Sequence, residues 1–148
     1  MELPPPEHYP DDGRRWVRLR LDKPYARDLF GIELLALDRG SVTLAVRFRE
    51  EFGFAPDVFQ GAVTSALAEY AAAWAASSLM EKGWTNLTLD QTVHFTGLAE
   101  GQRLIAEGSV VSSGRTITIS RAEIFAEKDG QRKLCAVMTQ TNRHAPQR

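Results

Sequence analysis

Apolar and polar residues alternate over most of the second half of the chain, which predicts a series of β-strands. Four strands are expected there, at residues 87–95, 102–112, 116–128 and 133–141. In the first strand, alternation places five side chains on one face: Leu87, Leu89, Gln91, Val93 and Phe95. Because consecutive strands joined by tight turns pair antiparallel, we expect the four strands to form a meander.

The first third of the chain predicts a hairpin preceded by less regular segments. Residues 32–37 and 41–48 alternate on either side of the turn Asp38-Arg39-Gly40. Residues 24–29 predict a short helix with Pro24 in its first turn. Residues 14–21 are compatible with a short strand or a helix. We expect residues 1–22 to form a partly extended N-terminal arm and residues 23–148 to form one domain.

An alanine-rich segment between the hairpin and the four strands predicts one long helix, at residues 60–82 and ended by Gly83. One side of this helix carries bulky apolar side chains: Val63, Leu67, Tyr70 and Trp74. Another side carries mostly small ones: Ala62, Ser65, Glu69, Ala73 and Ala76. We expect the bulky side to pack in the concave face of the sheet and the small side to approach another backbone. A long helix with one antiparallel sheet indicates the α+β class.

Composition and charge bear on the expected partners and location of the protein but do not identify its function. The 148 residues are 43% hydrophobic and carry a formal net charge of −1, so neither nucleic acid nor an anionic membrane is an expected partner. The start of the chain lacks the basic and apolar segments of a secretory signal, and we expect a cytoplasmic location. The single cysteine, Cys135, lies in an apolar run and is interpreted as a buried hydrophobe. The three histidines show no metal-ligand spacing, so no metal site is predicted.

Two segments carry a family resemblance. Residues 59–69, Phe-Gln-Gly-Ala-Val-Thr-Ser-Ala-Leu-Ala-Glu, resemble the start of the central helix in hot-dog thioesterases of the phenylacetate-degradation (PaaI-like) family. That family has His-Gly-Gly, a short apolar stretch, and then Leu-Ala-Asp or Leu-Ala-Glu. The strands from residue 87 onward, with Gly114-Arg115 before one of them, resemble the same family. The resemblance spans residues 31–141 and implies a hot-dog fold, in which an antiparallel sheet wraps around one long helix.

The resemblance also assigns candidate catalytic residues. Glu69 falls on the family's catalytic carboxylate, which acts as general base or nucleophile. Gly61 falls on the glycine whose backbone N–H polarises the thioester carbonyl. Gln60 stands where the family has histidine, and Ala62 replaces the second glycine. Fifteen residues before the carboxylate, Phe54 replaces an Asn or Gln.

These assignments imply an acyl-CoA or acyl-carrier thioester hydrolase that works as a homodimer. Gly61 and Glu69 lie about 12 Å apart along the predicted helix, too far to act on one carbonyl within one subunit. In the family, the carboxylate of one subunit faces the glycine N–H of the other. A dimer of dimers is a further expectation. No cofactor is implied beyond the coenzyme A of the substrate.

The resemblance and the charge pattern suggest substrate contacts. Besides Phe54, we expect Thr64, Ser65, Arg115 and Thr116 to contact substrate or coenzyme A. Thr64 and Ser65 are also compatible with hydrogen bonds to the preceding helical turn. Arg115 and four further basic residues can receive coenzyme A phosphates or form a solvated sheet edge. These four are Arg121, Lys128, Arg132 and Lys133.

Two alternatives to a thioester hydrolase remain open from the sequence. The departures at Phe54, Gln60 and Ala62 are compatible with a non-catalytic acyl-CoA-binding or structural hot-dog protein. In that interpretation Glu69 would pair with a Lys or Arg across a dimer interface. A hot-dog hydratase would require a catalytic histidine, and His94 is the candidate in a strand.

Overall fold

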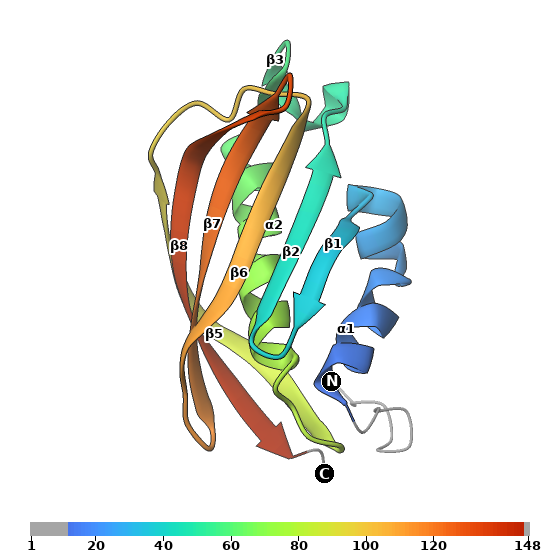
Figure 1. Ribbon diagram of the computed structural model, residues 1–148, viewed down its shortest axis with the longest axis vertical. Coiled ribbons are helices and arrows are strands. Elements are labelled where there is room, and N and C mark those ends of the chain that lie inside the picture. Colours follow the sequence, from blue (N-terminus) through green and yellow to red (C-terminus); the bar gives the residue numbers. More distant parts are fainter. Residues whose placement is uncertain (1–11, 147–148) are drawn as a thin grey trace.

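The protein is a six-stranded antiparallel sheet curved around one long helix, which confirms the predicted α+β hot-dog architecture (Figure 1). The computed structural model describes residues 12–146. The helix, α2, spans Gly61–Ser77. The strands of the sheet are β1 (Glu33–Asp38), β2 (Ser41–Arg47), β5 (Trp84–Phe95), β6 (Arg103–Ser113), β7 (Ile117–Lys128) and β8 (Gln131–Pro146). None of the helices in the described part of the chain is long and apolar enough to cross a membrane.

The strand order is β1-β2-β6-β7-β8-β5, so the predicted meander is wrong at one connection. β6, β7 and β8 pair in sequence, but β5 pairs with β8 and not with β6. The reason is that β6 already has β2 on one side and β7 on the other, and a strand has only two edges. β5 therefore lies at the edge of the sheet, opposite β1.

The central helix ends five residues earlier than predicted. Its last turn is closed by two serine hydroxyls, Ser77 donating to Ala73 O (2.8 Å) and Ser78 to Ala75 O (2.7 Å). The same Ser78 hydroxyl accepts a 2.7 Å hydrogen bond from the N–H of Gly40 in the β1–β2 turn. Serine in these positions competes for backbone groups and favours helix ends. Gly83, the predicted end, has φ of 78° and lies in the turn before β5.

Helix and sheet touch through small residues. A Cβ on Gly108 of β6 would lie 2.1 Å from the carbonyl oxygen of Ala71, so the two backbones approach as closely as glycine allows. The bulky Tyr70 lies elsewhere: its ring stacks on Tyr25 at 5.7 Å and meets Phe30 edge-on at 5.7 Å. The prediction that the whole bulky side faces the sheet is therefore wrong at Tyr70.

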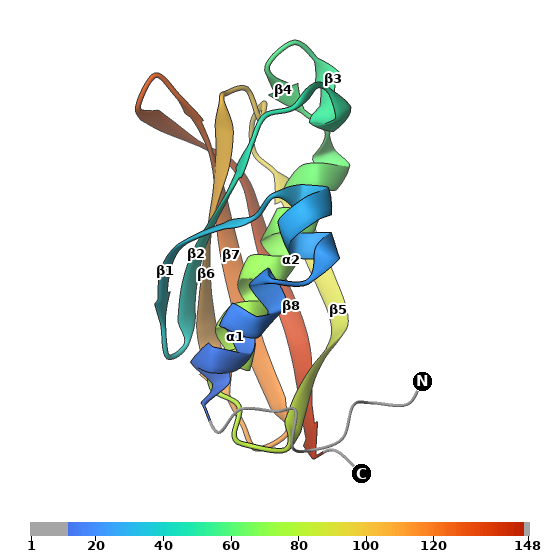
Figure 2. The same cartoon turned by 90° about the vertical axis from the view of Figure 1, so that its right-hand side faces the viewer.

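The N-terminal segment supplies the residues that cover Tyr70. α1 (Gly13–Leu21) is a helix, which decides between the two predicted alternatives, and η2 (Tyr25–Phe30) is a short π-helix. Val17 of α1 is fully buried. Figure 2 shows α1 and η2 running along α2 on the side that the sheet leaves open. Residues 1–11 of the predicted arm lie outside the described residues.

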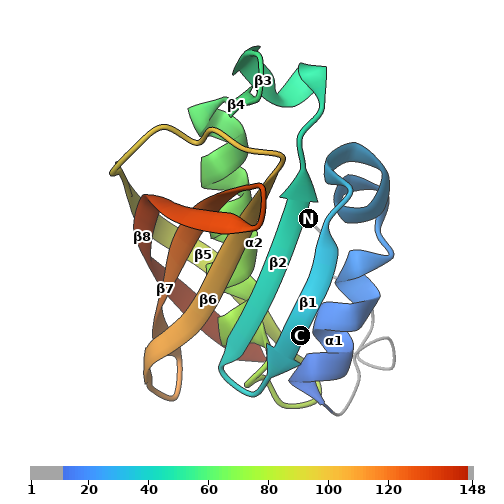
Figure 3. The same ribbon diagram turned by 45° about the horizontal axis from the view of Figure 1, so that its top comes forward.

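A small second sheet lies at the start of the central helix. The chain from β2 passes through η3 (Glu50–Phe52), β3 (Gly53–Ala55) and β4 (Val58–Phe59) before entering α2 (Figure 3). β3 pairs antiparallel with β4, and Val58 forms an isolated bridge with Glu100. This segment positions the residues around Gly61.

Candidate active site

Two backbone N–H groups are available at the start of α2. No described residue accepts a hydrogen bond from the N–H of Gly61 or Ala62, whereas the N–H groups of Val63 and Thr64 both bond to Gln60 O at 3.1 Å. Gly61 and Ala62 are exposed. A helix start carries unpaired donors and partial positive charge, so it stabilises a negatively charged oxygen. Gly61 thus has the local chemistry expected of an oxyanion donor.

Gln60 and Phe54 lie beside this helix start. The Gln60 side chain donates to the carbonyl oxygen of Gly53 at 3.2 Å, and its backbone N–H donates to Phe52 O at 2.8 Å. Gln60 therefore ties β3 to the helix. Phe54 is 69% exposed and lines a surface pocket of about 430 Å³.

Glu69 lies two turns along the same helix and is half-buried. Its Oε1 accepts a 2.8 Å hydrogen bond from the hydroxyl of Thr88 on β5. Burial raises the pKa of the Glu69 carboxyl, and the hydrogen bond from Thr88 opposes that rise. No lysine or arginine among the described residues forms an ion pair with Glu69. Within the subunit the carboxylate is therefore held by a neutral donor.

A β-bulge directly after Thr88 changes which positions of β5 face the helix. Asn86 and Thr88, at even positions, form hydrogen bonds with α2. Phe95, at an odd position, also lies against α2, and its ring is 3.2 Å from the place that a Cβ on Gly61 would take. Strict alternation forbids this, but the pairing of β5 with β8 shifts between Thr88 and Asp90. The predicted single face from Leu87 to Phe95 is therefore divided by the bulge.

Behind Thr88 lies a buried polar network that the sequence analysis missed. Gln140 Nε2 on β8 donates to Thr88 Oγ1 (3.0 Å) and to Asn142 Oδ1 (2.8 Å), and Asn142 Nδ2 donates to Ser120 Oγ (2.8 Å). Gln140, Asn142 and Ser120 are each at most 1% exposed. The signal was present in the sequence: Gln140 and Asn142 continue the period-two pattern of buried Met138.

The remaining contacts predicted on the helix have different environments. Thr64 is 1% exposed, and its hydroxyl donates to Gln60 O at 3.3 Å, which is the bond to the preceding turn. Ser65 is half-buried. Thr64 is thus covered in the isolated subunit, whereas Ser65 keeps part of its surface accessible.

Arg115 and Thr116 lie far from Gly61 within the subunit. They belong to the β6–β7 turn, at the end of the molecule opposite β3 (Figure 1). Arg115 is exposed and lines a pocket of about 340 Å³ together with Trp84 and His144. The carbonyl oxygen of Thr116 accepts from the N–H of His144 at 2.8 Å. The structure therefore does not join these residues to Gly61 in one subunit.

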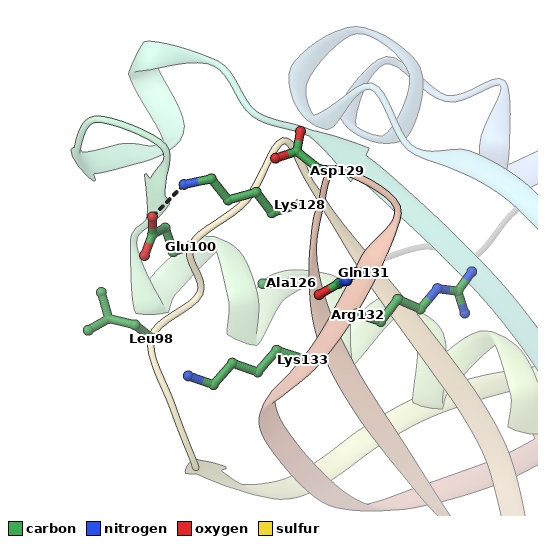
Figure 4. A pocket seen from close by; sticks show the side chains of 8 residues that line it. All are labelled: Leu98, Glu100, Ala126, Lys128, Asp129, Gln131, Arg132 and Lys133. Carbon is green, nitrogen blue, oxygen red and sulfur yellow. Dashed lines mark hydrogen bonds and ion pairs between the residues drawn. The ribbon is translucent and has the colours of Figure 1, made fainter.

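A charged pocket of about 470 Å³ lies at the β7–β8 turn (Figure 4). Lys128 pairs with Glu100 at 2.6 Å, and Arg132 pairs with Glu107 at 3.3 Å. Lys133 lines the same pocket, and among the described residues no carboxylate lies within ion-pair distance of it. Arg121 also forms an ion pair, with Glu123 at 2.5 Å. Of the four further basic residues, Lys133 is therefore the one without an ion pair to a described carboxylate.

Other candidate chemistries have little support in this arrangement. Cys135 is fully buried, and burial raises the pKa of its thiol to about 11, which keeps it protonated. His94 is exposed on β5. In the part of the chain that the structure describes, no three His, Cys, Asp or Glu side chains gather as metal ligands.

The family model for the thioesterase superfamily matches residues 58–133, which include Gly61, Glu69 and Thr88. The chain belongs to the thioesterase superfamily. Its fold is similar to that of a thioesterase family protein from Silicibacter pomeroyi, with 28% identity, a TM-score of 0.86, and 90% of this chain and 98% of that chain covered. No protein in the curated set matches this superfamily member at a significant level.

Two further solved structures share the fold of this thioesterase-superfamily chain. A thioesterase from Haemophilus influenzae is 23% identical, with a TM-score of 0.76 and 88% of each chain covered. A phenylacetic acid degradation-related protein from Ralstonia eutropha is 22% identical, with a TM-score of 0.74 and coverage of 88% of this chain and 98% of that chain. Both likenesses concern the fold.

Proposed function

We propose that the protein hydrolyses acyl-CoA or acyl-carrier thioesters as a homodimer, with Glu69 of one subunit and the Gly61 N–H of the other acting on one substrate. The observation that carries this proposal is the hydrogen bond from Thr88 to Glu69. A half-buried carboxylate held by a hydroxyl keeps an oxygen available for chemistry, whereas a carboxylate in an ion pair does not. Membership of the thioesterase superfamily supplies the reaction class.

The chemistry requires two groups. The thioester carbonyl oxygen would accept hydrogen bonds from the free N–H of Gly61, which stabilises the negative charge that develops on attack. Glu69 would remove a proton from water, or attack the carbonyl carbon itself. Either role needs the ionised carboxylate, and Thr88 favours that form. The thiol of the carrier leaves as the acyl product forms.

The edge strand β5 supports the dimer. One edge of β5 has no partner strand within the subunit, and exposed apolar side chains lie along and beyond it. These are Leu87 (42% exposed), Leu89 (54%), Phe95 (57%) and Leu98 (56%). A sheet edge that no strand covers and that carries exposed apolar side chains favours association with another chain. Two copies paired antiparallel along β5 would bring the start of one α2 toward the middle of the other.

Thiol release from a panel of acyl-CoA substrates tests the activity. The key variant is Glu69→Gln, which keeps an oxygen that can accept from Thr88 but cannot act as base or nucleophile. Wild-type turnover that is lost in Glu69→Gln supports the proposal. Equal rates in the two proteins would remove Glu69 from the mechanism, and tight acyl-CoA binding without wild-type turnover would favour a binding protein.

Gly61→Pro tests the oxyanion donor. Proline suits the first position of a helix, and Gln60 before it already has φ −63° and ψ 143°, which the residue before proline favours. The substitution therefore removes the N–H with little effect on the backbone. Gly61→Ala is the matched control, because it adds a carbon near Phe95 but keeps the N–H. We expect Gly61→Pro to lose far more activity than Gly61→Ala.

Mixed dimers test whether one site draws on two subunits. Glu69→Gln and Gly61→Pro protomers are each inactive alone, but a mixed dimer contains one site in which both groups are intact. Random mixing should restore about a quarter of the wild-type activity. Mixing that restores nothing, in a sample shown to contain mixed dimers, would contradict a site shared between subunits.

A further inference from the structure

We propose that Gln140 is a positioning residue for the site, which acts through Thr88 to keep Glu69 ionised. The inference rests on the proposed function for its meaning in catalysis, but its geometry belongs to one subunit. Gln140 lies on β8, two residues before Asn142, and does not touch Glu69 itself. It donates a hydrogen bond to Thr88, which in turn donates one to Glu69.

The direction of each hydrogen bond carries the argument. Asn86 Nδ2 donates to the backbone oxygen of Ala73 (3.0 Å), which can only accept, and also to Asn142 Oδ1 (3.5 Å). Asn142 therefore presents its oxygen to this side of the network, and Gln140 points its own NH₂ group at that oxygen. The same NH₂ group then donates its second hydrogen to Thr88 Oγ1. One acceptor position of the Thr88 oxygen is thereby occupied. The Thr88 hydroxyl hydrogen remains for Glu69, which must accept it.

This polarity selects between the two protonation states of Glu69. The carboxylate accepts the Thr88 hydrogen with every donor satisfied. A protonated carboxyl that donated to Thr88 would give up the hydrogen bond that Thr88 donates, and its neutral carbonyl oxygen is a weaker acceptor than a carboxylate oxygen. The network therefore opposes the effect of burial and favours the ionised form.

Gln140 holds this orientation against a local penalty. Its Oε1 is buried and has no hydrogen-bond partner among the described residues. An unpaired buried acceptor destabilises a protein. An apolar side chain of the same length would avoid that penalty, so the glutamine is better explained by its two donated bonds than by packing.

Few other ionisable groups face Glu69. Tyr70 on α2 and Tyr25 on η2 are its titratable neighbours, and burial raises the pKa of both, with a smaller contribution from the Glu69 charge. Both are therefore neutral at neutral pH. From β5, β7 and β8 the network presents only uncharged side chains: Asn86, Thr88, Ser120, Gln140 and Asn142.

The test measures the Glu69 pKa directly in three single variants. Gln140→Met keeps the length of the side chain and removes its donors, and Thr88→Val removes the hydroxyl. Ser120→Ala is the control, because it breaks the far end of the network without touching Thr88. The carboxyl carbon signal of Glu69 in ¹³C NMR, identified by its absence in Glu69→Gln, gives the pKa without any substrate. We expect a higher Glu69 pKa in Gln140→Met and Thr88→Val and an unchanged one in Ser120→Ala.

A double variant separates positioning from structure. If Gln140 acts through Thr88, adding Gln140→Met to Thr88→Val moves the Glu69 pKa no further. A further shift in the double variant, or an equal shift in Ser120→Ala, would overturn the proposal. If Gln140→Met does not fold, Gln140→Glu replaces it: its side chain accepts from Thr88, so its effect on Glu69 must be larger with Thr88 present than in the Thr88→Val background. Equal effects in the two backgrounds would likewise overturn the proposal.

Enzyme kinetics then test whether the change in the Glu69 pKa alters catalysis. We expect the acid limb of kcat/KM to move to higher pH in Gln140→Met, with kcat reduced about 10-fold and KM little changed. An acid limb that stays in place while the NMR pKa shifts would contradict the link to catalysis. Absence of thioesterase activity in the wild type would refute the proposed function, while the NMR result would still decide the role of Gln140.

Discussion

Thr88 on the edge strand donates a 2.8 Å hydrogen bond to Glu69 on the central helix, so the carboxylate of the candidate site is stabilised by a hydroxyl. Nineteen residues separate the two in sequence. Thr88 faces the helix by the same alternation as Asn86, and the β5 bulge that follows it shifts the later helix-facing positions to odd numbers. Most of the site's expected behaviour follows from this pair.

Replacement of Thr88 by valine should reduce activity by shifting the Glu69 equilibrium. Valine has nearly the shape of threonine but no hydroxyl, so the pKa of Glu69 rises further under the effect of burial. We expect kcat/KM to fall about 10-fold at neutral pH, and to recover as the pH is raised. Thr88→Ser keeps the donor and should retain near wild-type rates. A pH–rate profile of the three proteins checks this.

Glu69→Gln should stabilise the protein near neutral pH. Because burial raises the folded-state pKa of Glu69, the folded state binds more protons than the unfolded one between the two pKa values. Stability therefore falls as pH rises through that window, and the loss persists above it. The amide of glutamine does not titrate, so Glu69→Gln does not lose folding stability in this way. Thermal melts should give Glu69→Gln the higher Tm at pH 8, with the difference disappearing below pH ~4, where the unfolded carboxyl is also protonated.

Gly108→Ala should destabilise the fold through the helix–sheet contact. The new methyl group would lie 2.1 Å from Ala71 O and 2.4 Å from its carbonyl carbon, and neither backbone atom can rotate away. We expect a loss of about 1–3 kcal/mol or more in the free energy of unfolding. Gly97→Ala is the control, because its methyl group would lie at ordinary contact distances from Leu134 O (3.4 Å) and Lys133 Cε (3.8 Å). Urea unfolding of both variants measures the difference.

A charge on the β5 edge should break the proposed dimer. Leu89 is 54% exposed on β5, and Leu35 is 41% exposed on β1, at the other edge of the sheet. Leu89→Lys places a lysine on the edge that would pair, where it blocks edge-to-edge association. We expect this variant to be monomeric and inactive, and Leu35→Lys to remain dimeric. Light scattering coupled to gel filtration measures both masses; a dimeric Leu89→Lys would exclude this edge.

The Cys135 thiol should take no part in catalysis. Its side chain is fully buried, its Sγ lies 3.3 Å from Ile124 O, and its pKa of about 11 leaves almost no thiolate at neutral pH. Cys135→Ala should therefore hydrolyse substrate at the wild-type rate. Iodoacetamide should label the native wild-type protein slowly at pH 8 and the urea-unfolded protein quickly. Rapid labelling of the native protein would show that the thiol is accessible.

Local sequence patterns predicted the elements that local physics controls. The hairpin of β1 and β2 follows from alternation around a glycine-containing turn, and the start of α2 at Gly61 lies within one residue of its predicted position. Gly61 and Glu69 could be singled out because both lie in one short segment that resembles a family pattern. Where a prediction failed, as at the end of α2, the deciding contact came from another part of the chain: Gly40 N–H on Ser78.

The sequence by itself determined the long helix and the strands of the main sheet, and which carboxylate and glycine share that helix, because spacing along one element indicates both. Only the tertiary structure decided that β5 pairs with β8, that Tyr70 is covered by η2, and that Thr88 and Gln140 stand behind Glu69. Thr88 and Gln140 are 52 residues apart, and their contact exists only because the sheet closes around the helix. Closure is a sum of many long-range contacts, so no local pattern encodes it.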